Sequence, residues 1–592
     1  MQPLSPLAAA TDLVSFLIKA NGQPIDERCE VVAITTSTAL NRIPTSSLVV
    51  NTSPDNADGG QDWAPGVKIE ILLGYQGTLT SVFSGVVLKS AVGQTRGGRP
   101  TLTITCRDAA SALTLGRRSA LYLETTDRDV MTRLITNHGL AASVAITPAQ
   151  SDRLAQFSST DWDFLLTRAE ANGFVVNITA GHVSVQPPAF TSAPRLSLTY
   201  GVDILDFSLE EDADTQIPST SSSAWDPASQ TVLSSTATTQ KQNPLGADTS
   251  ASLAAINGSQ SLALATAAAL PLTELHAWAN AQLLKSRLAK IRGTLSFQGS
   301  TLATPDSTIR LAGLGSRFDG DAYVSAVTHE VSDGQWTTTA TIGLDPVWFA
   351  SRPDVSAPPA SALLPGVSGL HIGTVKQIDQ DPDNQFRILV NVPLIDANGA
   401  GLWARLAQPY ATRQAGTVFY PEIGDEVVLA FLGDDPRFPI IVGSLFSSSR
   451  PPPSSPNAKN SGKAIVTTGQ LKVLFDDEKK ILTLLTPAGN TLILSDDAHS
   501  ILLADQNGNS VKLGSDGISL ASTGNIAIQA ARNITLEAQN GSLDIKGTQS
   551  VAVSGLRIAL AADTEFTATG NATAALKSSG QTTIQGALVM IN

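Results

Sequence analysis

Two groups of acidic residues come nearest to a catalytic pattern in this sequence. Asp434-Asp435 forms one group, and Asp476-Asp477-Glu478 forms the other. A glycosidase needs two carboxylates roughly 5–9 Å apart for acid–base chemistry. Here Gly433 and Pro436 flank the first group and Lys479-Lys480 follows the second, as is typical of solvated turns. The pattern therefore favours turns over a glycan-cleaving site.

Metal and nucleotide chemistry lack a matching motif as well. No two of the six histidines have the spacing of metal ligands: His138, His182, His276, His329, His371 and His499. The nearest approach to a dinucleotide-binding fingerprint, Gly313-x-Gly315-x-x-Phe318, lacks its third glycine and predicts a plain turn. We therefore predict no catalytic residue, no cofactor and no metal ligand, and a protein that is not an enzyme.

Charge and cysteine content argue against two further classes. The chain has 39 Lys and Arg against 52 Asp and Glu, a net charge of −13 that repels phosphate backbones. The two cysteines, Cys29 and Cys106, are too few for a disulfide framework, and we expect both in the core. One stretch carries aromatic residues like those of nucleic-acid-binding barrels, but with few basic residues: Phe386, Trp403, Tyr410, Phe419, Tyr420 and Phe431. Core packing or contact between subunits explains these aromatic residues better.

Length and composition predict several domains that are mainly β with some α. The chain has 592 residues, only 15% of them charged, and is rich in small and β-branched side chains. The alternating run Thr101–Cys106 is typical of a half-buried strand. Helices are predicted after the capping box Thr126–Asp129, over residues 161–171, and over Leu272–Ile291 with Gly293 closing the last one.

Composition also divides the chain. A Ser, Thr, Ala, Gln and Asn-rich stretch predicts a flexible insert at about 212–260 within a first region that spans residues 1–350. A proline-rich linker follows at 351–368, and short strands with turn signals at 369–446 predict a small barrel such as an OB-fold. A Ser/Pro linker occupies residues 447–462.

The last segment, 463–592, is a repeat. Pairs of the form apolar-x-apolar recur every eight residues, as in Ile518/Leu520, Ile526/Ile528 and Ile534/Leu536, and the phase returns at Leu560, Leu576 and Ile584 after a slip of one residue. A strand of three or four residues cannot bury its apolar face alone, so either successive copies of the repeat stack or several chains intertwine.

Seven short motifs follow one another in the predicted barrel: Gly373-x-Val375, Asp381-Pro382, Arg387-x-x-Val390-x-Val392-Pro393, Trp403-Ala404-Arg405, Ala415-Gly416, Pro421-Glu422-Ile423-Gly424-Asp425-Glu426-Val427 and Gly433-Asp434-Asp435-Pro436-x-x-Pro439. In this order they resemble the OB domain of VgrG proteins and contractile-phage spike proteins. Further motifs resemble the hub pattern of phage late control protein D: Gln156, Asp161-Trp162-Asp163-Phe164-Leu165, Arg168-Ala169-Glu170-Ala171-Asn172-Gly173-Phe174, Ala224-Trp225-Asp226-Pro227 and Arg317-Phe318-Asp319-Gly320-x-x-Tyr323-Val324. Residues 463–592 resemble the trimeric β-helix needle of the same proteins.

The resemblance implies the structural central spike of a contractile injection system. Three copies would form a hub that caps the tail tube, an OB-fold collar and a needle that punctures the target envelope when the sheath contracts. Implied partners are the inner tube protein and baseplate proteins at the hub, effector cargo and, transiently, the target membrane, with no nucleic acid. The apolar residues expected at the trimer axis are Ile518, Leu520, Ile526, Ile528, Ile534, Leu536, Leu560, Leu576 and Ile584.

The chain departs from some relatives in two places. Only the Ser/Pro linker lies where certain phage spikes carry a lysozyme domain, and residues 586–592 contain no His-x-His pair for iron, so we expect a separate PAAR-like tip protein. The first twenty residues lack a basic stretch before their apolar residues, which predicts synthesis in the cytoplasm without a signal peptide. The resemblance implies assembly into a phage tail-like particle, released from the cell in an extracellular system. The alternative is a β-helix tailspike or adhesin that binds or cleaves cell-surface glycans.

Overall fold

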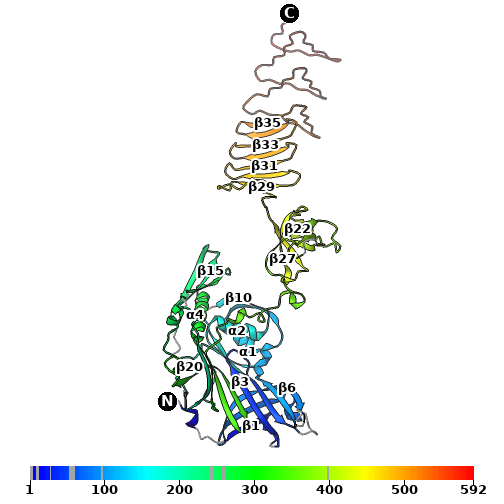
Figure 1. Ribbon diagram of the computed structural model, residues 1–592. Helices are drawn as coiled ribbons and strands as arrows, with labels where there is room; N and C mark the ends of the chain where they lie inside the picture. Colours follow the sequence, from blue (N-terminus) through cyan, green and yellow to red (C-terminus); the bar gives the residue numbers. More distant parts are fainter. Residues whose placement is uncertain are drawn as a thin grey trace. The chain divides into compact units, whose positions relative to one another are not determined.

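The computed structural model describes residues 4–8, 13–26, 28–52, 60–94, 96, 98–147, 150–238, 245–256, 258, 260–395 and 399–591. The chain forms two compact units, Met1–Leu445 and Phe446–Asn592. Strands far outnumber helices in the first unit, and every regular element described in the second unit is a strand (Figure 1). The expected fold class, mainly β with some α, is confirmed.

A large, mostly antiparallel sheet forms the body of the first unit. Its strands follow the order β14-β18-β21-β20-β3-β4-β7-β6-β5-β1-β2, and β13 joins through β19, which pairs with β20. Side chains alternate along these strands, so that one face buries residues such as Leu48, Ile71 and Ile104. The strands are β1 (Val14–Ala20), β2 (Gln23–Pro24), β3 (Glu30–Ala39), β4 (Thr45–Asn51), β5 (Lys68–Tyr75), β6 (Thr78–Gln94), β7 (Pro100–Arg107), β13 (Leu196–Thr199), β14 (Ile204–Glu211), β18 (Ile291–Gln298), β19 (Ser307–Ala312), β20 (Gly320–Ser332) and β21 (Gln335–Ile342).

Smaller elements complete this part of the unit. Two short sheets pack with the helices: β8 (Arg118–Thr126) with β10 (Gln150–Ser159), and β9 (Ala141–Val144) with β11 (Val175–Thr179) and β12 (His182–Gln186). Single turns of 3-10 helix occur at η1 (Pro6–Ala8), η2 (Gln61–Trp63), η3 (Ala109–Thr114), η4 (Phe349–Ser351), η5 (Pro359–Ala362) and η6 (Leu432–Asp434). Of the two cysteines, Cys106 is buried as expected, whereas Cys29 is only half-buried.

Two of the three predicted helices have the expected ends. The helix α1 (Asp127–Thr136) begins after Thr126, whose hydroxyl accepts a hydrogen bond from the backbone N–H of Asp129. In the same way Thr160 caps α2 (Asp161–Ala171), which ends at Asn172 and Gly173 as predicted. Each capping hydroxyl satisfies a backbone N–H that has no partner within the helix.

The third predicted helix is shorter than expected. The helix α4 (Leu272–Leu288) ends before Ile291, which instead begins β18 and pairs with Glu211 of β14. The prediction that Gly293 closes this helix is wrong, because Gly293 lies within β18. A Cβ atom there would approach the carbonyl oxygen of Ser208 to 1.9 Å. Glycine thus allows close contact between two strands at this position.

The predicted flexible insert is also wrong for its described residues. Within and just after 212–260 lie β15 (Thr220–Asp226), β16 (Thr231–Ala237), α3 (Ser250–Ile256) and β17 (Leu262–Thr266), whereas residues 239–244, 257 and 259 fall outside the described part. The buried side chains of β15 are small ones that face α4, and the Ser222 hydroxyl donates to the Leu275 carbonyl at 2.8 Å. Small hydroxyl side chains therefore serve packing here rather than disorder.

The expected small barrel is confirmed near the end of the first unit and has five strands. Its strands close in the order β22-β23-β24-β28-β27 around a core that includes Val390 and Leu429. They are β22 (His371–Gln377), β23 (Ile388–Asn391), β24 (Leu402–Leu406), β27 (Glu426–Phe431) and β28 (Pro439–Ser444), with a small hairpin of β25 (Ala411–Thr412) and β26 (Ala415–Gly416) between them.

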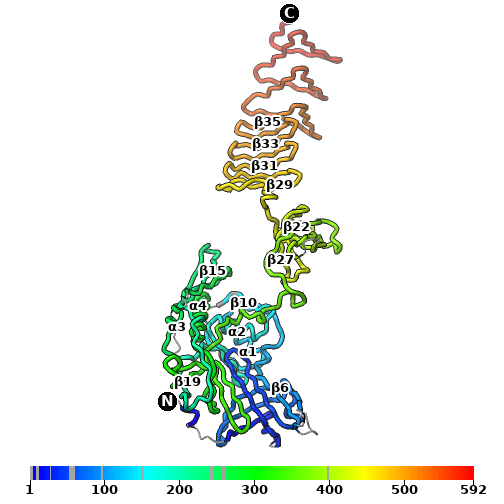
Figure 2. The backbone as a smooth tube through the Cα atoms, viewed as in Figure 1, coloured from blue at the N-terminus to red at the C-terminus, as the bar shows by residue number. Residues whose placement is uncertain are grey.

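The second unit is a single layer of short strands. Seven strands of five residues pair antiparallel with their neighbours, and Figure 2 shows the backbone continuing beyond them as successive loops. No helix or strand is assigned to the described residues 522–591. The strands are β29 (Gly462–Val466), β30 (Lys472–Asp476), β31 (Ile481–Leu485), β32 (Thr491–Ser495), β33 (Ser500–Ala504), β34 (Ser510–Gly514) and β35 (Gly517–Ala521).

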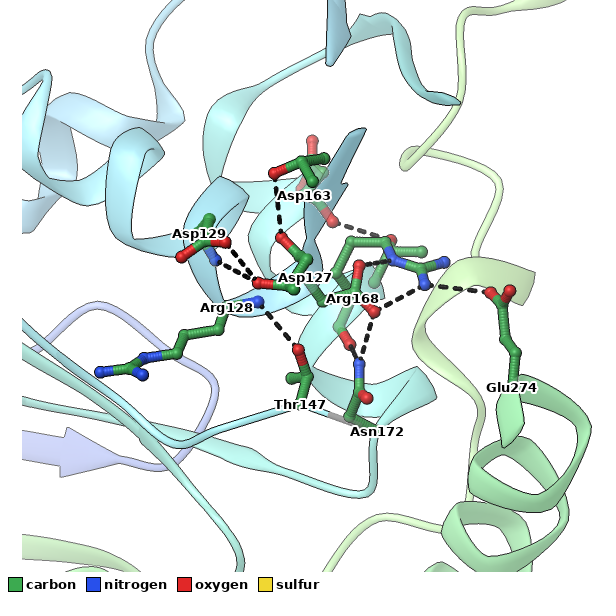
Figure 3. A network of polar contacts seen from close by, with 11 residues as sticks. Asp127, Arg128, Asp129, Thr147, Asp163, Arg168, Asn172 and Glu274 are labelled. Atoms are coloured by element: carbon green, nitrogen blue, oxygen red, sulfur yellow. Dashed lines mark hydrogen bonds and ion pairs between the residues drawn. The ribbon is translucent and has the colours of Figure 1, made fainter. Parts of the chain in front are cut away.

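A buried polar network ties three helices of the first unit together (Figure 3). Arg168 on α2 donates to both carboxylate oxygens of Asp127 on α1, at 2.6 and 2.8 Å, and to Glu274 on α4 at 3.2 Å. The side chain of Asn172 donates to the same Asp127 carboxylate at 2.8 Å. The Arg168 and Asp127 side chains are only 15% and 5% exposed, so their charges depend on each other rather than on water.

We predict that Arg168→Ala lowers the free energy of unfolding of the first unit by about 3 kcal/mol, because the substitution leaves the Asp127 carboxylate buried without its cation. Urea unfolding followed by tryptophan fluorescence measures this loss. The matched control is Arg28→Ala, since Arg28 pairs with Asp26 but is 90% exposed, and its expected effect is within about 0.5 kcal/mol. Equal effects of the two substitutions would contradict the assignment.

A buried histidine makes the stability of the same unit depend on pH. The Nδ1 atom of His329, on β20, lies 3.0 Å from the hydroxyl oxygen of Thr338, and its ring packs beside Trp336. Burial lowers the pKa of this imidazole to about 4. Between pH 6.5 and 4 the unfolded chain binds a proton that the folded chain does not, so the free energy of unfolding falls as the pH drops through this range.

We expect the contribution of His329 to the free energy of unfolding to fall by up to about 3 kcal/mol between pH values above 6.5 and pH 4. His329→Gln should remove this share of the pH dependence. Urea midpoints of both proteins at pH 7.5 and pH 5.0 test the expectation, and an identical fall for the two proteins would refute it.

Candidate assembly surfaces

One face of the β29–β35 sheet is apolar except for Lys463 on β29, and we call its apolar side chains the apolar ladder. Strand register places the apolar pair of each strand beside the pair of the next, for example Leu482 opposite Leu494 and Leu513 opposite Ile518. The members are Ile465, Val473, Phe475, Leu482, Leu484, Leu492, Leu494, Ile501, Leu503, Val511, Leu513, Ile518 and Leu520. The repeat of apolar pairs therefore places its side chains on one face, as the sequence predicts.

Among the described residues of the second unit, no second layer covers the apolar ladder. Leu503 is 54% exposed, and the side chains of the last strand are the most exposed, with Ile518 at 74%. The opposite face of the sheet is mixed, with Leu474 and Ile493 on early strands but Lys512 and Ser519 on the last two. A sheet is stable in water when its apolar face packs on another layer, and the described residues of the second unit do not supply this layer.

The residues predicted at a trimer axis fall into two groups. Ile518 and Leu520 belong to the apolar ladder on β35. The others lie in residues 523–591, where every described side chain is exposed: Ile526, Ile528, Ile534, Leu536, Leu560, Leu576 and Ile584. Each of these is more than half exposed, so the single chain offers them no core, and their place at an axis stays a prediction.

The barrel carries a second exposed apolar surface at one of its ends. Strand directions place the end of β22, the start of β23, the ends of β24 and β28 and the start of β27 at the same end, which we call the Phe386 end. Both long loops there, residues 378–387 and 407–425, expose large apolar or aromatic side chains. They are Ile378, Phe386, Tyr410, Val418, Phe419, Tyr420 and Ile423.

The aromatic residues singled out in the sequence thus separate by role. Phe431 is buried at the end of β27, in line with core packing, and Trp403 on β24 is half-buried. The four others, Phe386, Tyr410, Phe419 and Tyr420, are exposed at the Phe386 end. At the same end, Arg387 forms ion pairs with Asp381 and Asp383.

The acidic groups are held by cations instead of facing one another. Arg437 donates to both oxygens of Asp435, at 3.0 and 2.6 Å, and this pairing holds the pKa of that carboxyl below its ordinary value. Asp435 is largely buried, unlike the solvated turn that we expect. In the second unit, Asp477 pairs with Lys463 and Glu478 pairs with Lys459, as is typical of surface turns. None of these carboxylates is paired with another carboxylate in a way that resembles a glycosidase.

A cavity of about 450 Å³ lies in the first unit, between α2, α4 and the ends of β20 and β21. Two of its charged side chains are engaged with each other: Lys285 forms an ion pair with Glu170, whose other oxygen accepts a hydrogen bond from the backbone N–H of Phe349. Among the described residues no group of three or more His, Cys, Asp or Glu side chains could hold a metal ion. No helix described in the chain is long and apolar enough to cross a membrane.

Two protein families match the chain in agreement with this architecture. The family described as "Alg8 N-terminal domain" matches residues 10–333, and the one described as "Type VI secretion system/phage-baseplate injector OB domain" matches residues 371–446. The first match covers more than half of the 592 residues, and the chain belongs to the Alg8 N-terminal domain family. The second match coincides with the closed barrel.

Similar curated proteins carry VgrG names. The chain is 33% identical over 96 residues to "Actin cross-linking toxin VgrG1" of Vibrio cholerae serotype O1, which is 15% of this chain and 9% of that protein. It is also 33% identical over 75 residues to "Type VI secretion system spike protein VgrG3" of the same species, 12% of this chain and 7% of that protein. The chain spans less than a tenth of the length of each relative. Together with the match of the OB domain family, these similarities confirm the expected resemblance to VgrG-like spike proteins.

Solved structures to which the chain shows a partial likeness include two tail proteins. The 43 kDa tail protein of prophage MuSo2 from Shewanella oneidensis is 11% identical, with a TM-score of 0.43 over 56% of this chain and 98% of that one. A tail protein of Neisseria meningitidis MC58 is 15% identical, with a TM-score of 0.43 over 58% and 99%. An Escherichia coli type VI secretion component, described as similar to T4 tail proteins gp27 and gp5, is 13% identical, with a TM-score of 0.37 over 72% and 99%.

Proposed function

We propose that this protein is the structural central spike of a contractile injection system, and that three copies form it. The observation that carries the proposal is the apolar ladder, followed by residues 523–591 in which every described side chain is exposed. A segment of this length cannot offset its loss of conformational entropy without burying apolar surface. Further copies of the same chain supply the missing layer, because each copy offers the same repeat.

Three chains around one axis would bury the apolar ladder of the second unit and would also pair its backbone groups. Their ladders would face each other and bury the apolar pairs, at about 25 cal/mol for each Å² removed from water. Winding around the axis would also give the backbone groups of residues 522–591 partners on neighbouring copies and remove the open sheet edges. The result is a stiff needle that can transmit the force of sheath contraction to a target envelope.

The remaining parts receive roles from the same proposal. Residues 1–350 would form the hub that docks on the inner tube and baseplate proteins, residues 369–446 the collar, and residues 463–592 the needle, with linkers at 351–368 and 447–462. A PAAR-like protein would cover the tip, effector cargo would travel with the assembly, and the spike would contact the target membrane in passing. The chain would act within a phage tail-like particle and carry no cofactor and no catalytic site.

The alternative, a tailspike or adhesin that cleaves or binds glycans, has less support. Such an enzyme would need two carboxylates free to act on a sugar, whereas Asp435 and Asp477 are each engaged with a cation. The same pairing does not conflict with a mechanical role.

The first prediction from this proposal concerns mass. Light scattering of the purified full chain should give three times 61.6 kDa at concentrations where a weak complex would dissociate. Three chains share one continuous apolar interior in the proposal, so we expect a trimer that persists on dilution. A stable, soluble monomer would overturn the proposal.

The second prediction separates the two faces of β35. Ile518→Asp together with Leu520→Asp should prevent assembly of the trimer, because six carboxylates would be buried near one axis. The matched control is Ser519→Asp, which places the same charge on the opposite face of the same strand and should leave the trimer intact. Assembly unaffected by the double substitution would contradict axial packing of the ladder.

A further inference from the structure

The loop before β23 holds an aromatic residue in an unusual backbone conformation. Phe386 has a φ of 60°, in the left-handed region, and its side chain is 80% exposed. Bulky residues rarely adopt this region, because the Cβ atom crowds the carbonyl oxygen. Gln380 and Asn384 of the same loop also have positive φ, of 56° and 54°. A loop with this much unfavourable backbone geometry has to be held by other interactions.

A single carboxylate holds this loop. The two oxygens of Asp381 accept hydrogen bonds from the backbone N–H groups of Asp383, Gln385 and Arg387, at 3.2, 2.8 and 3.1 Å. They also accept from Nε of Arg387 at 3.1 Å and from its Nη2 at 2.6 Å. The Asp381 side chain is only 6% exposed. We call this set of contacts the Asp381 clamp; it spans both sides of Phe386 and fixes the residue in the exposed position.

Packing within the barrel does not account for Phe386. The buried core of the barrel consists of aliphatic residues such as Val390, Leu429 and Ile441, and the phenyl ring stays outside it. A loop that keeps strain in order to expose an aromatic ring points to a contact with another molecule. The same end of the barrel exposes Val418 and Phe419 on the loop 407–425, at 71% and 61%.

Chain connectivity identifies the partner as a second copy of this chain. The strand β28 ends at Ser444, at the Phe386 end, and β29 begins at Gly462. If the copies intertwine from β29 onward, each barrel is tethered to the others by only a short linker, a span of at most about 60 Å of extended chain. Tethering over such a distance makes even a small apolar contact effective, because the local concentration is high.

Cyclic symmetry then limits which surfaces can meet. In a ring of three copies, an interface away from the axis joins two different patches, so a Phe386 that lies off the axis meets a patch other than Phe386 of the next copy. The loop 407–425 offers such a patch at the same end of the barrel. We propose that the Asp381 clamp holds Phe386 so that its ring packs against Val418 and Phe419 of the next copy and locks the three barrels together. This inference rests on the proposed trimer.

Site-specific photo-cross-linking of the full chain tests the contact. Phe386 is replaced by the photoreactive p-benzoylphenylalanine, and denaturing gels after irradiation report covalent dimers and trimers. The matched control carries the same group in place of Leu394, which is 89% exposed but follows β23 at the opposite end of the barrel. We expect cross-links between chains from position 386, mapped by mass spectrometry to residues 407–425, at least fivefold more abundant than from position 394.

The outcomes separate this inference from the proposed function. A trimer by light scattering without cross-links between chains from position 386, or with cross-links outside 407–425 only, overturns the contact and leaves the spike proposal standing. A monomer overturns both.

The clamp itself is tested by a second pair of variants in the cross-linking background. Asp381→Ala removes all the contacts of the clamp carboxylate and should lower the cross-link yield from position 386 at least threefold, because the loop no longer fixes the ring. Asp383→Ala is the control, since Asp383 is 61% exposed and makes a single ion pair with Arg387 at 2.6 Å. An unchanged yield in Asp381→Ala, with the trimer intact by light scattering, would show that the clamp does not position Phe386.

Discussion

A short strand that cannot bury its own apolar face is the constraint on which the second unit depends. Each of its strands has five residues, and the two apolar side chains of a strand point to one face. One chain builds only one layer, and its apolar ladder therefore stays in contact with water. Beyond β35 even this layer is missing, since the described residues form no further strands. The free energy of folding that burial of this apolar surface would provide has to come from contact with other chains. This requirement links the repeat to a role in an assembly.

The first unit differs from the second, because it buries several apolar cores within one chain. The large sheet and the helices have separate buried cores, and the Arg168 network, which is mostly buried, joins α1, α2 and α4. Such a unit keeps its shape before any partner binds. In the proposed spike this difference is useful: the hub folds alone and presents a defined surface to the tube, whereas the needle gains its stiffness only when copies meet.

The barrel combines both kinds of behaviour. Its interior is complete, with residues such as Ile388 and Ile441 fully buried, yet its Phe386 end exposes a group of aromatic and aliphatic side chains. The Asp381 clamp shows that this exposure is not a consequence of a loose loop. Five different N–H groups converge on one carboxylate to keep the loop in a conformation that its sequence does not favour. A precise surface at a loop requires this kind of support, because a mobile aromatic ring would lose entropy on binding.

Local patterns in the sequence determined the features that depend on neighbouring residues. The caps at Thr126 and Thr160 fixed the starts of α1 and α2, alternation fixed strands such as β7, and the spacing of apolar pairs fixed which side chains share the face of the ladder. The order of motifs in residues 369–446 was enough to recognise the barrel. Tertiary structure decided what depends on residues distant in the chain. Pairing with Glu211 turned Ile291 from a helix into a strand, and packing on α4 ordered β15 despite its composition. The left-handed backbone of Phe386 is likewise invisible in the sequence, since it results from the convergence of several donors on the Asp381 carboxylate.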